Sequence, residues 1–224
     1  MLIAEISNNH FGNFALAKEM IRIAKESGAD AVKGQAFVAE DFINGSMPSE
    51  FYETCAFTLD QYIDLIAFGA DLKIPVFYSI LSKEMIPLTD VQKYNKITAK
   101  QWETFTIPFE WSDEPGTFIS MSSIDKVMTL DHAQIMYASP YMCEKVDFVS
   151  LFSLKSKYGR AIGLSDHSTT IRPVIEAIAV HNIRLIEKHF TLEKNHKWQD
   201  EVYRDSIHGA LPKELEKIAK ALGG

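Results

Sequence analysis

Two histidines follow short apolar runs late in the chain and could bind a metal ion. They are His167 in the sequence LSDHS and His189 in the sequence EKHFT. Neutral imidazole is a common ligand of divalent transition metals, and manganese, zinc or iron would accept such a pair. A carboxylate such as Glu5 or Asp205 could complete the ligand set. The alternative is that each histidine is a hydrogen-bonded residue at the rim of the fold.

Two lysines, Lys33 and Lys96, lie in apolar runs, where an unpaired buried charge is costly. Either a substrate phosphate or carboxylate neutralises them, or an internal carboxylate such as Glu5 or Glu187 does, and both alternatives stay open. A bound anion would also accept hydrogen bonds from hydroxyl groups. The candidate donors are Ser79, Ser120 and Ser165. A lysine could instead form a Schiff base with a carbonyl substrate.

Eight short apolar runs recur along the chain and are typical of buried strands. They lie at 2–6, 31–35, 76–80, 94–98, 117–121, 134–138, 161–165 and 185–190. Between many of them, apolar residues recur at helical spacing, as at Leu16, Met20 and Ile23. Strands that alternate with helices indicate a parallel sheet that is covered on both faces.

Eight repeats favour closure of that sheet into a (β/α)₈ TIM barrel, so we expect one compact α/β domain over residues 1–224. The main alternative is an open doubly wound sheet, but the first strand is not followed by the glycine-rich turn of a dinucleotide fold. In a barrel, chemistry collects where the strands end at their carboxyl side. The polar residues expected there also include Asn9, Gln35 and Tyr137.

Composition excludes several classes of function. The net charge of −7 shows no clustered basic face for nucleic acid. No apolar stretch approaches the roughly 20 residues that span a bilayer, and the N-terminus does not have a signal-peptide pattern, so we expect a cytoplasmic protein with no membrane contact. Cys55 and Cys143 are expected to be buried free thiols. The other histidines at loop or helix positions are expected to be solvated or structural, and these are His132, His181, His196 and His208.

Several motifs together resemble the N-acetylneuraminate (sialic acid) synthase family. The opening IAEISNNHFG and the later GADAVKGQAF are similar to that family's first two strands. IGLSDHS and IEKHFTLEK look like its late-strand motifs, and Asp205 precedes PKEL at the spacing of its acidic loop and final helix. The resemblance covers residues 3–38 and 161–219 well.

This resemblance implies a metal-dependent condensation of phosphoenolpyruvate with an N-acetylated hexose aldehyde, which releases phosphate and gives a nine-carbon 2-keto acid. The metal would be manganese or magnesium, with zinc as an alternative, held by His167 and His189. Phosphoenolpyruvate would be bound by Lys33, Lys96, Ser120 and Ser165. The amino sugar would face Glu5, Tyr137 and Asp205.

The middle of the chain departs from the family's pattern. Ile80 stands where a phosphate-binding threonine is usual, and Ala99 and Gln101 replace a serine and a glutamate. Gln101 cannot carry a proton as a glutamate would. Ile135 takes the position of a sugar-binding asparagine, and Ser7 that of a glycine.

The resemblance implies that family members usually continue into an antifreeze-protein-like domain, and we expect no such domain within residues 1–224. We therefore expect either a homodimer of a different kind or a separate chain that supplies the domain. Two alternatives to the synthase stay open: another metal-dependent enzyme of sugar acids, such as an aldolase, lyase or isomerase, and a non-catalytic synthase-like subunit.

Overall fold

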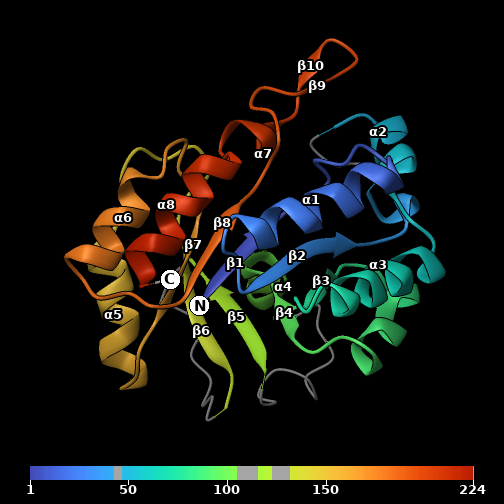
Figure 1. Cartoon of the computed structure of the whole chain (residues 1–224). Coiled ribbons are helices and arrows are strands. Elements are labelled where there is room, and N and C mark those ends of the chain that lie inside the picture. The colour runs from blue at the N-terminus through green and yellow to red at the C-terminus, as the bar shows by residue number, and fades with distance from the viewer. Residues whose placement is uncertain (43–46, 105–115, 123–131, 224) are drawn as a thin grey trace.

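The computed structural model describes residues 1–42, 47–104, 116–122 and 132–223. Eight parallel strands close into a barrel in chain order, and β8 pairs with β1 (Figure 1). The strands are β1 (Leu2–Glu5), β2 (Ala31–Ala36), β3 (Val76–Ile80), β4 (Asn95–Ile97), β5 (Thr117–Met121), β6 (Gln134–Ala138), β7 (Gly163–Asp166) and β8 (Ile186–His189). Each overlaps one of the eight apolar runs, so the predicted (β/α)₈ barrel is confirmed.

Helices lie outside the barrel, most of them between successive strands and the last two after β8. They are α1 (Phe14–Glu26), α2 (Ser49–Cys55), α3 (Leu59–Asp71), α4 (Ala99–Thr104), α5 (Phe148–Tyr158), α6 (Arg172–Ala179), α7 (Arg204–Ile207) and α8 (Pro212–Leu222). Helix α1 begins at Asn13, whose side chain accepts a hydrogen bond from the backbone of Leu16. It ends before Gly28, whose φ of 90° is left-handed and easy only for glycine.

The connection between β3 and β4 differs from the expected α-helical pattern. Strands β3 and β4 are joined by the 3₁₀-helix η2 (Lys83–Asp90), which contains Pro87. Proline has no backbone N–H and its ring clashes with the preceding turn, so an α-helix is unfavourable in this segment. A second 3₁₀-helix, η1 (Ala39–Phe42), follows β2.

Side chains inside the barrel form an apolar layer and, nearer the carboxyl ends of the strands, a polar layer. The apolar layer consists of Ile3, Ala31, Phe77, Phe118 and Met136. Because side chains alternate along a strand, the residues two positions later face the same way. Those positions hold, among others, the charged residues Glu5 and Lys33 and the hydroxyls of Ser79 and Ser120. The barrel therefore has a charged upper half on a hydrophobic base.

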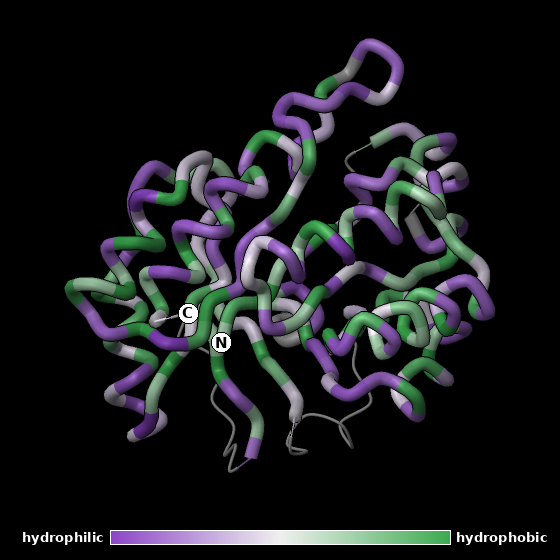
Figure 2. Tube along the Cα trace, viewed as in Figure 1, coloured by the Kyte–Doolittle hydropathy of each residue, from purple (hydrophilic) through white to green (hydrophobic). Residues whose placement is uncertain are grey.

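The main apolar cluster packs between the outer surface of the barrel and the helices. Figure 2 shows hydrophobic stretches along the barrel strands and hydrophilic colouring over much of the hairpin that projects from the fold. That hairpin consists of β9 (Lys197–Trp198) and β10 (Glu201–Val202). Its Trp198 contacts Phe51 of α2, with ring centroids 5.6 Å apart.

The sequence also predicts that both cysteines are free, that both are buried, and that the chain has no membrane-spanning helix. Both cysteines are free thiols, as expected, but only Cys55 is fully buried, whereas Cys143 is half-buried. Within the described residues, no helix has the length and apolar character to cross a bilayer.

Candidate functional site

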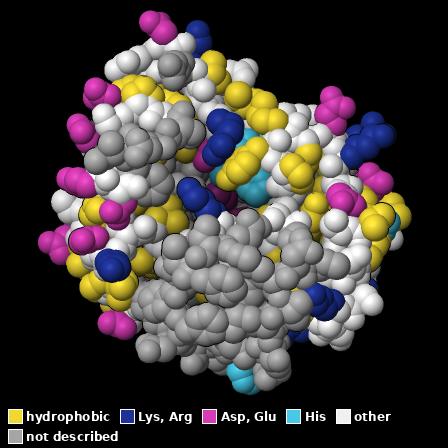
Figure 3. Space-filling model, turned by 180° about the vertical axis from the view of Figure 1, so that it is seen from behind, with side chains coloured by type: hydrophobic (Ala, Val, Ile, Leu, Met, Phe, Trp, Pro, Cys, Tyr) yellow, Lys and Arg dark blue, Asp and Glu magenta, His cyan; other side chains and the backbone are white. Residues whose placement is uncertain are grey.

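The carboxyl ends of β7 and β8 bring His167 and His189 together. Their ring centroids lie 5.3 Å apart, and both residues are buried. The Nδ1 of His167 lies 2.8 Å from the backbone oxygen of Ser139, to which it can donate a hydrogen bond. Such a bond leaves Nε2 with its lone pair, which is the usual state of a metal-binding histidine. Figure 3 shows histidine side chains in a hollow, beside basic and acidic ones.

Charged side chains inside the barrel form ion pairs, one across the interior between β4 and β8 and one between the neighbouring strands β1 and β2. Lys96 of β4 lies 2.9 Å from Glu187 of β8, and Lys33 of β2 pairs with Glu5 of β1. Lys33 also lies 3.9 Å from Glu187. Of the two alternatives for the lysines, internal pairing is therefore present in this structure. It removes the cost of isolated buried charges without preventing an exchange of partners.

The electrostatics of this cluster favour ionised carboxylates. Burial by itself would raise the pKa of Glu187, but Lys33, Lys96 and the hydroxyl of Ser165 hold that pKa down at about 2. Burial lowers the pKa of Lys33 to about 8. Glu187 is therefore an ionised partner for the ammonium groups of both lysines.

The three candidate serines have different environments. Ser165 donates a hydrogen bond of 2.8 Å to Glu187, and Ser79 accepts one of 3.3 Å from Lys33. The hydroxyl of Ser120 is buried and has no hydrogen-bond partner among the described residues. Since buried hydroxyls are rarely left unpaired, Ser120 is the serine best placed to receive a ligand.

The two candidate amides differ in their contacts. Asn9 donates a hydrogen bond of 3.0 Å to the backbone oxygen of Phe190, just beyond β8, so its amide nitrogen ties two strand ends together. Its Oδ1 is buried without a partner among the described residues. Gln35 is only half-buried, and its oxygen lies 3.5 Å from the amide nitrogen of Asn8.

Asp205 is buried beside the histidines and firmly held. Its Oδ2 accepts hydrogen bonds of 2.6 Å from Ser7 and 2.9 Å from Tyr203. Burial by itself would raise its pKa, but the neighbouring His208, these two hydrogen bonds and the charge of Arg204 keep that pKa below its ordinary value. Asp205 is therefore ionised at neutral pH.

Tyr137, expected to face a sugar, lies elsewhere. It packs in the cluster between barrel and helices, because Met136 beside it points into the barrel. Ile135 faces outward for the same reason. The aromatic residue at the site is Tyr141, which follows β6, is half exposed and lies over His167 with ring centroids 4.4 Å apart.

His208 was expected to be solvated or structural, and the solvated alternative is wrong. It is fully buried, and its ring centroid lies 4.4 Å from that of His189. The available signal was its spacing, since it follows Asp205 by three residues, which is about one helical turn.

Comparison with known proteins assigns the chain to a family. The profile of the NeuB family matches residues 64–223, well over half of the 224 residues. The chain belongs to the NeuB family. This confirms the resemblance to the N-acetylneuraminate synthase family that the sequence motifs indicated.

Individual relatives of this NeuB family chain are distant. An uncharacterized protein from Methanocaldococcus jannaschii is 30% identical in an alignment 225 positions long, which covers 89% of this chain and 64% of that protein. A pseudaminic acid synthase from Campylobacter jejuni is 27% identical in an alignment 231 positions long, which covers 89% of this chain and 67% of the synthase. The chain thus spans about two thirds of the length of these relatives.

A solved structure shares the fold. The N-acetylneuraminic acid (sialic acid) synthetase from Leptospira borgpetersenii in complex with citrate superposes with a TM-score of 0.83 at 23% identity. The match covers 99% of this chain and 82% of that one.

Two of the positions at which this NeuB family member departs from the pattern, Ile80 and Gln101, are in contact. The side-chain amide of Gln101 donates a hydrogen bond of 2.6 Å to the backbone oxygen of Ile80, and its oxygen accepts one of 3.1 Å from the backbone of Thr98. Gln101 thus fastens α4 to the ends of β3 and β4. Its amide makes structural contacts and cannot transfer a proton as a carboxylic acid can.

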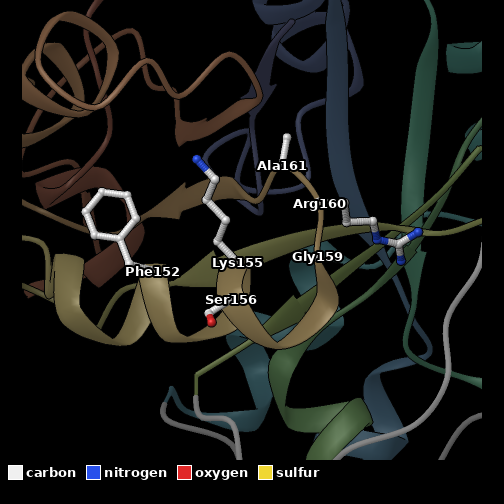
Figure 4. Close-up of a pocket in the computed structure, with 6 residues that line it drawn as sticks. All are labelled: Phe152, Lys155, Ser156, Gly159, Arg160 and Ala161. Atoms are coloured by element: carbon white, nitrogen blue, oxygen red, sulfur yellow. The ribbon is translucent and has the colours of Figure 1, made fainter.

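A surface pocket at the end of α5 is not part of this site. It is lined by Phe152, Lys155, Ser156, Gly159, Arg160 and Ala161 (Figure 4). Ala161 precedes β7, so the pocket lies at the amino end of the barrel strands, away from the end where barrels carry chemistry.

Proposed function

We propose that this chain is the catalytic barrel of a nonulosonic acid synthase, which condenses phosphoenolpyruvate with an N-acetylated hexose aldehyde. The observation that carries the proposal is that a rim of neutral imidazoles, His167 and His189, stands directly on a buried layer of two lysines and two carboxylates. The names of the C. jejuni and L. borgpetersenii relatives support the same class of product, a sialic-type acid.

In the proposed reaction, C3 of phosphoenolpyruvate bonds to the aldehyde carbon, water adds to C2, and phosphate leaves. A divalent metal bound by the histidines, manganese or magnesium with zinc as an alternative, would supply a Lewis acid for the aldehyde oxygen. Burial lowers the pKa of both His167 and His189, so both rings are neutral and can donate a lone pair. The unpartnered Nδ1 of His189 fits this role.

The lysines would bind the phosphate and carboxylate of phosphoenolpyruvate by exchanging partners. Lys33 and Lys96 are held in place by Glu5 and Glu187, so little side-chain entropy is lost when a substrate oxygen joins them. Ser120 offers an unpaired hydroxyl to the same anion. The buried Asp205 and the half-buried Gln35 would be polar contacts of the sugar.

One observation favours a second candidate function, a synthase-like protein that binds these ligands without turning them over. Gln101 cannot transfer a proton, and its side chain is engaged with the backbone of Ile80 and Thr98. Such a protein would bind phosphoenolpyruvate and release no phosphate.

The test is an assay of released phosphate from phosphoenolpyruvate and N-acetylmannosamine with the Mn²⁺-loaded protein, and mass spectrometry of the product. The proposal expects phosphate and a nine-carbon 2-keto acid in equal amounts, both lost in Lys96→Met. Tight binding of phosphoenolpyruvate without phosphate release, with several N-acetylated hexoses, would favour the second candidate. Absence of binding would contradict both.

A further inference from the structure

His208 is a buried imidazole without a hydrogen bond. It caps the short helix α7, is 0% exposed, and neither ring nitrogen has a hydrogen-bond partner among the described residues. Buried polar atoms are paired in the great majority of cases, so an unpaired imidazole needs an explanation. A ligand that the ring is shaped to receive would provide one.

The neighbours of His208 are themselves metal-binding groups. One ligand atom from each of His189, Asp205 and His208 can be chosen so that all three lie within 4.8 Å of one another. The Nε2 of His208 lies 3.7 Å from Oδ1 of Asp205, and the Nδ1 of His189 lies 4.0 Å from Oδ2 of the same carboxylate. Ligands that share one ion at about 2.0–2.2 Å are separated by comparable distances.

The hydrogen-bond environment suits a cation. Both ring nitrogens of His208 and the Nδ1 of His189 are buried and have no hydrogen-bond partner among the described residues. The hydroxyls of Ser7 and Tyr203 donate to Oδ2 of Asp205 and orient that carboxylate. Imidazole nitrogens and a carboxylate therefore converge on the same small volume.

We propose that His208 is a metal ligand, and that it forms a site of two histidines and one carboxylate with His189 and Asp205. This rests on the proposed function, because it concerns the metal that the reaction would use, but it differs from the pair His167 and His189 expected from the sequence. The ring centroid of His167 lies 5.8 Å from that of His208.

The proposed ligand set also determines the metal preference. Imidazole nitrogen suits zinc, iron and other transition ions, whereas magnesium prefers oxygen ligands and keeps much of its water. The site is therefore expected to bind Zn²⁺ and Mn²⁺ in preference to Mg²⁺. Three protein ligands leave coordination positions for a substrate oxygen.

The test is calorimetric titration of the chelator-treated protein with Mn²⁺ or Zn²⁺ alone, together with the visible absorption of bound Co²⁺, which reports its ligands independently of activity. His208→Leu and His189→Leu remove ligands at similar volume, Asp205→Asn changes a charge without changing shape, and His181→Ala is a matched control outside the site. Urea midpoints in chelator show whether each variant is folded.

We expect His208→Leu and Asp205→Asn to weaken binding by at least the roughly 10–100-fold that even outer partners of metal sites cost, and to shift the Co²⁺ bands. His181→Ala should leave both readouts unchanged. If His208→Leu and Asp205→Asn bind as the parent does while His167→Leu and His189→Leu lose the metal, the inference about His208 is overturned and the proposed metal site remains. Unchanged binding in all of these variants would overturn both.

Discussion

Ser7 is the residue at which departure from the family's glycine has a visible structural consequence. Its φ of 46° is left-handed, which costs an L-residue about 1–2 kcal/mol. Its hydroxyl donates to the buried carboxylate of Asp205, and such bonds to charged groups contribute about 1.5–3 kcal/mol. The strained backbone of Ser7 is therefore offset by a hydrogen bond that orients Asp205.

Two substitutions at this position separate these effects. Ser7→Ala keeps the strain and loses the hydrogen bond, so its free energy of unfolding should fall by about 1.5–3 kcal/mol. Ser7→Gly also loses the bond but relieves the strain, so it should lie between the alanine variant and the parent. Urea unfolding measures both. An alanine variant as stable as the glycine variant would show that this φ is not strained.

Glu187 makes the free energy of unfolding depend on pH in the acidic range. Its pKa is about 2 in the folded protein against an ordinary 4.5, so below pH 4.5 the unfolded chain binds its proton first. The stability that Glu187 contributes is complete above pH 4.5 and is lost as pH falls towards 2, in total about 3 kcal/mol.

The matched comparison is Glu187→Gln, in chelator so that no metal contributes. The difference in free energy of unfolding between parent and variant should narrow as pH falls from 4.5 towards 2. A difference that stays constant over that range would mean that the lysines do not stabilise the carboxylate.

At the scale of elements, a buried ion pair fixes the two strand ends that carry His167 and His189. Lys188 of β8 lies 2.6 Å from Asp166 of β7 and also donates to the backbone oxygen of Ser168. Each charged residue immediately precedes one of the histidines, so this pair sets the separation of the rings.

Lys188→Met leaves Asp166 buried without its main counter-charge and should cost about 3–5 kcal/mol. The double variant with Asp166→Asn should cost less than Lys188→Met alone, because no uncompensated charge remains. Thermal or urea unfolding of the three proteins gives the comparison. Equal losses in the single and double variants would show that packing of Lys188, rather than its charge, is what matters.

Gln101 joins α4 to the ends of β3 and β4, so a substitution there should affect both stability and the rate of reaction. Gln101→Glu should restore a general acid or base, and such groups typically contribute about 10²–10⁴-fold in rate. It should also cost stability, because a carboxylate cannot donate to the backbone oxygen of Ile80. Gln101→Ala should lose the stability without the gain in rate. An unchanged rate of phosphate release in Gln101→Glu would place the proton transfer at another group.

For the whole molecule, the barrel could be predicted from the sequence because parallel strands are buried on both faces and appear as apolar runs. The position of Lys33 or His189 in the site follows from its place at a strand end. The direction of a side chain is harder to predict, since a shift of one residue reverses it, and Tyr137 faces outward for that reason. The burial of His208 depends on how α7 packs against β8, which no local pattern encodes.

The most direct test of the account is calorimetric titration of the Mn²⁺-loaded protein with phosphoenolpyruvate, in parallel with Lys33→Met and Lys96→Met. The account predicts one binding site in the parent and a loss of binding in each variant that corresponds to about 1.5–3 kcal/mol for a charge-assisted hydrogen bond. Binding of equal strength in all three proteins would contradict it, because the polar layer of the barrel would then not be the site of the anion.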